Sequence, residues 1–432
     1  MKSTGNYLSL KHQKMETNIY SLGVIKLKYV YRVIAISMII LLLSTGCHMN
    51  EDTGKGIRVI ESGLSVSNEG ILYSCLQLNN ALCFYDFESM QSVYLCAEPN
   101  CNHTDYERCK AFRSSHMPFL YNEKLYYFTG ESYYERDGSI KHTTKLIESD
   151  FSGSIEKTIT EFEANNITSY ICYLVGDTLY YIGAKIRYTD LGSSNYSSHI
   201  LFSINLSDGR VNTIGKILDG YNVNIMPHGI IDNKLFLTIH YTEDDINFAD
   251  YNMEDWSSIP LRYNCHMDLE SGIIEKIDLP VPSKIVDNYY YYNKRYDNGA
   301  YKFVARDWRK GTERVIYDGP VGNNVDLIDG KMFFSPVEGI DKNGDPIRKL
   351  DDNGVIFFSD IEYSYDLKKG KLTTIQKKIS NRENLDIVAS SEDKYIVFYM
   401  DIDNNIHNRL AYISKVDYLN GMDDFVLIDL PS

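Results

Sequence analysis

Residues 176–181 read GDTLYY, and residues 205–215 read NLSDGRVNTIG. The first stretch is a polar turn that leads into apolar and aromatic residues. The second is a turn that starts at Asn or Asp, passes through Gly, and leads into residues that favour strands. Short polar turns between such runs join antiparallel strands, so each stretch predicts a hairpin.

The first stretch recurs seven times along the chain. The copies are NEGILY at 68, NEKLYY at 122, GDTLYY at 176, DNKLFL at 232, DNYYYY at 287, DGKMFF at 329 and EDKYIV at 392. Their starts are 54, 54, 56, 55, 42 and 63 residues apart. The second stretch alternates with the first, as DFESM at 86, DFSG at 150, NLSDG at 205, DLESG at 268, DWRKG at 307, DLKKG at 366 and DYLNG at 417. Each repeat therefore supplies two hairpins, or four strands.

A four-stranded sheet cannot bury both of its faces alone. Packing such sheets face to face around a ring buries them and leaves only short edges. The sequence therefore predicts an all-β protein with a single β-propeller of about seven four-stranded blades over residues 57–432, and six or eight blades are the alternatives. The strand IRVIES at 57–62 precedes the first copy, and we expect it to complete the last blade and close the ring.

The repeats are similar to those of TolB-like and YWTD-like propellers, and especially to the domain of unknown function 5050 repeats of bacterial cell-surface proteins. Those repeats share the alternation of (D/N)-G/N-x-(L/I)-Y-Y with D-(L/F/I)-x-x-G. The resemblance covers roughly residues 57–430 and implies a cell-surface lipoprotein. It implies no reaction, because propellers include enzymes, scaffolds and receptors.

The charge distribution argues against nucleic acid as a partner. The formal net charge is −15, and the first 46 residues carry six basic residues against one acidic residue, or +5. The remaining body therefore carries −20. Such a body repels phosphate backbones and anionic lipid headgroups. We expect membrane contact only through an anchor.

Residues 1–46 predict an export signal of the lipoprotein type. Three basic residues precede an apolar stretch at 33–43, and STGC at 44–47 follows it. The stretch is shorter than the ~20 apolar residues that span a bilayer core. STGC resembles a lipobox, in which Cys47 is lipidated and becomes the new N-terminus, although Ser44 stands where leucine is usual. An ordinary signal peptide is the alternative. We expect an extracytoplasmic protein held by a lipidated tether at 47–56.

One loop between the first and second blades is rich in metal-binding side chains. The segment CAEPNCNHTDYERC places Cys96, Cys101, His103 and Cys109 within 14 residues. Thiolates and an imidazole at such spacing can surround one zinc ion, which would be structural because four protein ligands leave no open position. A disulfide between two of the cysteines is the equal alternative outside the cytoplasm. The other interpretations are that all three thiols are free, or that His103 caps a turn. The resemblance implies a structural role for the loop and no particular ligand.

Loop aromatic residues are the candidates for contact with a ligand. The insertion at 241–256 carries Tyr241, Phe248, Tyr251 and Trp256 among acidic residues. Exposed aromatic side chains there could stack on sugars or contact a protein. The competing interpretation is a surface loop whose aromatic side chains only hold it against the protein. The sequence contains no nucleophile elbow, zincin helix or P-loop.

Two functions follow from these features. The first is a monomeric, non-enzymatic module that binds a protein or a cell-wall glycan through loops on one face of the propeller. The second is a carbohydrate-active enzyme, a glycosidase or lyase. It requires two carboxyl groups ~5–10 Å apart, at least one with a raised pKa. A purely structural or envelope-sensing role is a third possibility.

Overall fold

The computed structural model describes residues 57–431 except 62–63, 68, 76–80, 97, 99, 104–107, 113–115, 135–139, 151–154, 163–165, 168–170, 189–194, 244–260, 342–345, 348–357, 380–382, 402–405 and 430. The predicted signal peptide, Cys47 and the tether lie outside this range. Within it, no helix is long and apolar enough to cross a membrane.

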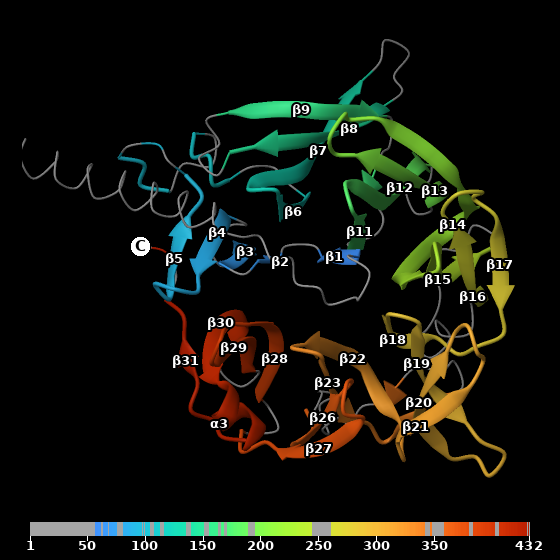
Figure 1. The fold of residues 1–432 in the computed structure, drawn as a ribbon. Helices are drawn as coiled ribbons and strands as arrows, with labels where there is room; N and C mark the ends of the chain where they lie inside the picture. Colours follow the sequence, from blue (N-terminus) through green and yellow to red (C-terminus); the bar gives the residue numbers. More distant parts are fainter. Residues whose placement is uncertain are drawn as a thin grey trace, which may run out of the picture.

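The described strands form antiparallel groups of four arranged around a ring, which is a β-propeller, and three of these groups are joined in one 13-stranded sheet (Figure 1). We call the groups of four strands blades 1 to 7, in chain order. Blade 1 contains β2 (Leu64–Val66), β3 (Gly70–Cys75), β4 (Ala81–Asp86) and β5 (Gln91–Tyr94). Blade 2 contains β6 (His116–Tyr121), β7 (Lys124–Tyr134), β8 (Ile140–Ser149) and β9 (Glu156–Phe162). Blade 3 contains β11 (Ile171–Val175), β12 (Thr178–Tyr188), β13 (Asn195–Asn205) and the first half of β14 (Val211–Ile231).

The later blades follow the same order. Blade 4 contains the second half of β14, β15 (Lys234–Thr242), β16 (Leu261–Asp268) and β17 (Ile274–Ile277). Blade 5 contains β18 (Pro282–Val286), β19 (Tyr289–Arg295), β20 (Tyr301–Asp307) and β21 (Glu313–Tyr317). Blade 6 contains β22 (Val321–Ile328), β23 (Lys331–Pro336), β26 (Ile361–Asp366) and β27 (Lys371–Gln376). Blade 7 contains β28 (Glu383–Ser390), β29 (Lys394–Asp401), β30 (Ile406–Ser414) and β31 (Val426–Leu427). Additional short strands are β10 (Asn166–Ile167), β24 (Gly339–Ile340) and β25 (Pro346–Ile347).

Each copy of the first sequence pattern forms the second strand of one blade. These strands are buried on both sides, as their apolar sequence predicted; Tyr290, Tyr291 and Tyr292 of β19 are each at most 1% exposed. The outermost strands are more exposed, and β17 has no buried residue. The buried side chains form seven clusters, each shared by two neighbouring blades, including blades 7 and 1. Face-to-face packing therefore runs around the whole ring.

The expected closure by the N-terminal strand is wrong. The strand β1 (Ile57–Glu61) pairs with β11 of blade 3, with Ile57 opposite Val175, and not with blade 7. Blade 7 already has four strands of its own, whereas the inner edge of β11 is available for pairing. Because β1 also pairs with β2, it joins blades 1 and 3 across the inside of blade 2 (Figure 1).

The ring closes through side chains between blades 7 and 1. Ile71, Tyr85, Ile396 and Leu410 belong to one buried cluster there. β31 and β30 lie beside the strands of blade 1 in the view along the ring (Figure 1). Within the described residues, no strand is shared between the two blades.

The turns divide the ring into two faces. The turns between the first and second strands bond to those between the third and fourth strands; for example, the N–H of Leu206 donates to the carbonyl of Asp177 at 2.9 Å. Trp308 N–H donates likewise to the carbonyl of Asn288 at 2.8 Å. We call this side the turn face. The opposite side, the loop face, carries the connections between second and third strands and those between consecutive blades.

The seventh copy of the second pattern differs from the others. Residues Lys415–Leu419 form a short helix, α3, in which the Ser414 hydroxyl accepts a hydrogen bond from the N–H of Asp417 at 3.1 Å. The pattern residue Tyr418 is buried and donates a hydrogen bond to Glu362 of blade 6 at 2.6 Å. The segment therefore keeps the position of a turn while its aromatic side chain fills the space between blades 6 and 7.

The described glycines of the second pattern adopt a left-handed backbone, and two of them form a matched pair. Gly272 and Gly311 both have φ of +69°. A Cβ on Gly272 would lie 2.3 Å from the carbonyl oxygen of Ile214, whereas a Cβ on Gly311 would meet only the tip of Arg306 at 3.6 Å. Met90 occupies the equivalent position in blade 1, with φ of +55°.

We expect Gly311→Ala to lower the free energy of unfolding by about 1 kcal/mol, the usual penalty of a left-handed alanine. Gly272→Ala should cost clearly more, because the backbone must also move away from Ile214. Urea denaturation of the two full-length variants checks this. Equal losses of unfolding free energy in the two variants would contradict this, because they would show that the contact with Ile214 adds no strain.

A polar chain inside blade 4 makes stability depend on pH. The Thr238 hydroxyl donates to Asn264 Oδ1 at 2.7 Å and so accepts from His228 Nε2 at 2.8 Å. This places the proton of a neutral imidazole on Nε2. Burial, together with the charges of Arg262 and His240, lowers the pKa of His228 to about 3.

Acid should therefore destabilise the fold. Below about pH 6.5 the unfolded histidine binds a proton that the folded one excludes until about pH 3, so stability is present above pH 6.5 and is lost as pH falls. The slope is about 1.4 kcal/mol per pH unit for this group. Unfolding midpoints at pH 7, 6 and 5 should fall less steeply in His228→Asn than in the unchanged protein. Parallel curves would contradict the assignment.

Candidate metal centre

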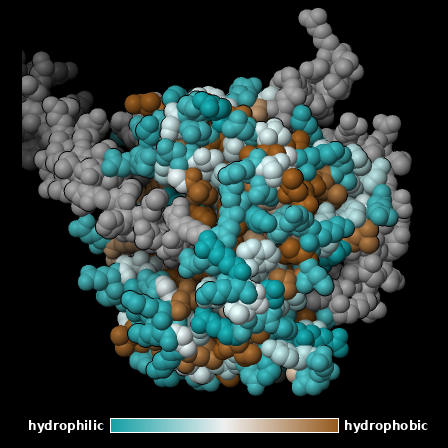
Figure 2. All heavy atoms as spheres, turned by 45° about the vertical axis from the view of Figure 1, so that its right-hand side comes forward, coloured by the Kyte–Doolittle hydropathy of each residue, from teal (hydrophilic) through white to brown (hydrophobic). Residues whose placement is uncertain are grey.

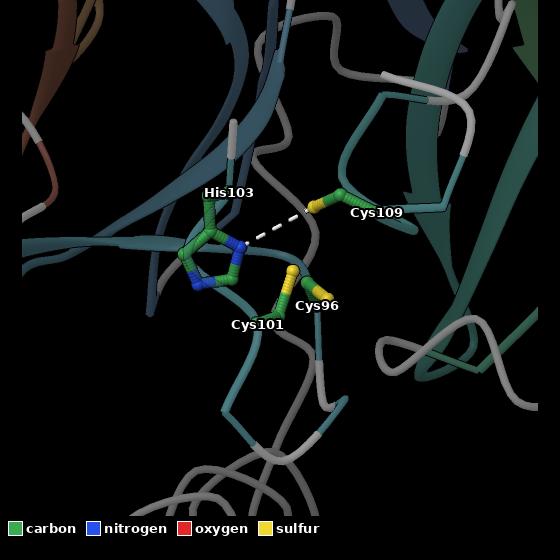
Figure 3. A group of neighbouring side chains, drawn as sticks. All are labelled: Cys96, Cys101, His103 and Cys109. Atoms are coloured by element: carbon green, nitrogen blue, oxygen red, sulfur yellow. Dashed lines mark hydrogen bonds between the residues drawn. The ribbon is translucent and has the colours of Figure 1, made fainter. Parts of the chain in front are cut away.

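The predicted cysteine-rich loop lies between β5 and β6, on the loop face. Its four candidate side chains converge, and their ligand atoms all lie within 4.8 Å of one another (Figure 3). Cys96, Cys101 and His103 are half-buried, and Cys109 is buried. The structure thus brings together all four residues that the sequence singled out.

Backbone hydrogen bonds hold the parts of the loop that carry the thiols. The N–H of Cys101 donates to the carbonyl of Glu98 at 3.2 Å, and that of Phe112 donates to the carbonyl of Cys109 at 3.0 Å. The loop is also fixed to blade 1, because the N–H of Leu82 donates to the carbonyl of Ala111 at 2.8 Å. The positions of the thiols therefore follow from the fold of the main chain.

The imidazole is oriented by an aromatic neighbour. The ring of His103 stacks on that of Tyr94, with centroids 4.2 Å apart and an interplanar angle of 24°. His103 Nδ1 lies 3.3 Å from Cys109 Sγ. His103 has φ of +54° and Asn100 has φ of +65°, so the chain turns sharply on both sides of Cys101. The stack and the turn direct Nδ1 toward the sulfur atoms.

The thiol of Cys109 is in a desolvated position. Burial raises its pKa to about 12. A thiol there stays protonated at neutral pH unless a cation is close. A bound metal ion would supply that positive charge.

The donor set matches a closed tetrahedral site for a soft or borderline metal ion. Zinc binds sulfur at ~2.3 Å and imidazole nitrogen at ~2.0–2.1 Å, which puts tetrahedral ligand atoms ~3.5–3.8 Å apart. The four ligand atoms all lie within 4.8 Å of one another, which exceeds that spacing by at most about 1 Å. Cys96, Cys101 and Cys109 are each present as a thiol.

The second predicted site is only partly described. Phe248, Tyr251 and Trp256 lie outside the described residues. Tyr241 is half-buried at the loop-face end of β15, where it packs edge-on against Tyr263 at 6.1 Å. Its ring therefore supports the core of blades 3 and 4 as well as reaching the surface.

Two described carboxyl groups lie close together: the Tyr399 hydroxyl is 3.0 Å from Glu383 Oε1 and 3.2 Å from Asp401 Oδ2, and Glu383 and Asp401 are opposite each other on β28 and β29. The glycosidase or lyase alternative also requires a raised pKa, and five other carboxyls show the opposite shift. Hydrogen bonds from neighbouring groups hold the pKa of these five carboxyls below the ordinary value, and burial opposes that shift. These are Glu148, Asp177, Asp268, Glu313 and Asp366.

Two features of this centre were missed in the sequence. Tyr94 lies two residues before Cys96, and a tyrosine at that position does not by itself indicate that its ring stacks on His103. The contact of Cys109 and Ala111 with blade 7 depends on residues almost 300 positions later. Only the closed ring reveals that contact.

No known protein-family profile matches the chain, and no curated protein is significantly similar to it. Solved structures with similar folds include the β-propeller domain of the Trilobed protease from Pyrococcus furiosus, at 12% identity over 85% of this chain and 98% of that one, with a TM-score of 0.38. TolB from Acinetobacter baumannii is 11% identical over 81% of this chain and 78% of that one, with a TM-score of 0.27. An oligogalacturonate lyase in complex with manganese is 11% identical over 68% and 69%, with a TM-score of 0.33.

Proposed function

We propose that this protein is an extracytoplasmic lipoprotein whose propeller binds a protein or a cell-wall glycan through its loop face. The propeller supplies many loops on a rigid ring, an arrangement that suits recognition. The lipobox-like STGC at 44–47 supports a lipid anchor at Cys47. The domain of unknown function 5050 resemblance supports a place at the bacterial cell surface.

The position of β1 is the observation that carries the proposal. Ile57 lies opposite Val175, at the end of β11 that leads into the turn at 176–177. The chain therefore enters the ring at its turn face. An anchored tether of ten residues reaches at most ~35 Å, so it keeps the turn face toward the membrane. The loop face is then directed outward.

The loop face carries aromatic side chains at the ends of blades 3 and 4. Tyr196 and Tyr221 meet edge to face at 5.1 Å. Tyr241 lies close by, since a Cβ on Gly220 would be 3.7 Å from its ring. Tyrosines combine an apolar ring with a polar tip, which suits contacts with sugars and proteins. In the view of Figure 2, hydrophilic residues surround small separate hydrophobic groups, which suits a monomer.

Anchoring is tested by replacing the cysteine. We expect the full-length protein to incorporate a clickable fatty acid in its bacterial host and to sediment with membranes. Cys47→Ala should lose the label and leave the membrane fraction. Cys83→Ala, at a cysteine outside both the lipobox and the metal centre, serves as the control and should keep both. A Cys47→Ala protein that remains labelled would contradict the anchor.

The face assignment is tested within a single blade. Asn298, between β19 and β20, is exposed on the loop face, and Lys310, between β20 and β21, is exposed on the turn face. A photo-crosslinking residue at position 298 should yield adducts with envelope protein or glycan in intact cells. The same residue at position 310 should yield few, or adducts with lipid.

Equal protein or glycan adducts at both positions would contradict a single binding face. Adducts at position 310 alone would reverse the assignment. Digestion of the adducts with protease or with a cell-wall hydrolase separates a protein partner from a glycan partner.

A further inference from the structure

The four converging side chains lie against the one interface that closes the ring. Cys109 and Ala111 are members of the buried cluster that blades 7 and 1 share, together with Ala389 and Ile396 of blade 7. Cys96 and Cys101 pack against the same cluster. The loop thus covers the junction between the first and last blades.

Among the described strands, none is shared across this junction. Blades 1, 3 and 4 are linked by backbone hydrogen bonds through β1 and β14, whereas the described strands of blade 7 form a separate sheet. Contact between blades 7 and 1 therefore depends on packed side chains. A rigid loop across it would stabilise the closed ring.

A disulfide does not account for the arrangement. It would use two of the three sulfur atoms and leave the third thiol and the imidazole of His103 without a reason to converge. Four donors of the type that zinc prefers, each within 4.8 Å of the others, are explained by one central ion. The stacking of Tyr94 on the imidazole fixes the direction of its nitrogen, as outer-shell groups do at metal sites.

We propose that Cys96, Cys101, His103 and Cys109 bind one Zn²⁺ as a closed structural site that fastens the loop over the junction of blades 7 and 1. Binding of Zn²⁺ displaces the protons of the three thiols, which are released to solvent, and leaves a site with a net charge of −1. The ion has four protein ligands and no open position, so it takes no part in a reaction.

The first experiment measures metal content and thiols in the full-length protein purified in detergent from an exporting host. We expect one zinc per chain by elemental analysis. Replacement of zinc by Co²⁺ should produce the visible absorption bands of tetrahedral cobalt with thiolate-to-cobalt charge transfer. His103→Ala and Cys109→Ser should both lose zinc and the cobalt spectrum.

Cys83→Ala is the matched control. Cys83 is a buried thiol in the same cluster, outside the four ligands, so this variant should keep one zinc per chain. His103 is only half-buried, so its loss tests binding even where Cys109→Ser impairs folding through the packed interface. A chain that takes up no zinc under reducing conditions, or that shows a disulfide among these cysteines, overturns the proposal.

The role of the zinc-bound loop in holding blades 7 and 1 together is tested by hydrogen exchange of the same proteins. Removal of zinc should speed exchange in peptides from β3, β4, β29 and β30, and leave peptides from β19 and β20 unchanged. In zinc-bound Cys83→Ala, peptides from β19 and β20 should exchange at the same rate as in the unchanged protein. Peptides from the junction should still exchange more slowly with zinc bound than without it. Zinc binding with no difference in exchange at the junction would overturn the role in ring closure.

Discussion

Packing between neighbouring sheets is the constraint on which this structure depends. Every blade has a second strand that is apolar on both sides, and no single sheet can cover both sides of it. The seven buried clusters each combine side chains from two blades, so no blade has a core of its own. A ring is the arrangement that gives every blade two neighbours. The position of the cysteine-rich loop and the separation of the turn face from the loop face both follow from it.

The architecture could be predicted because its signals are local. GDTLYY and NLSDG each contain a turn and the start of a strand within a few residues, and repetition identifies the unit. The partner of β1 could not be predicted in the same way. Ile57 and Val175 pair through backbone groups, which carry no sequence signal, and the free edge of β11 exists only in the folded ring. The helix at Lys415–Leu419 could not be predicted either. Its sequence matches the turn pattern, but Tyr418 is buried between blades 6 and 7, a contact that exists only in the folded ring.

For the candidate metal centre too, some features could be predicted from the sequence and others could not. Cys96, Cys101, His103 and Cys109 are close in sequence, and residue type with spacing is sufficient to group them. Their separations, the stacking of Tyr94 and the junction with blade 7 required coordinates. For the aromatic insertion, the sequence singled out Tyr241 as a surface contact, and its ring proves to serve the core of blades 3 and 4 as well.

The pairing of β1 with β11 also affects the order in which the chain can fold. Local hairpins form quickly, whereas a contact between residues 57 and 175 must wait for the whole of blade 2 and the start of blade 3. During synthesis or export, β1 can meet the neighbouring β2 early, but its longer partner β11 is absent throughout that interval. Ile57 can therefore take its place beside Val175 only after more than a hundred later residues have been made.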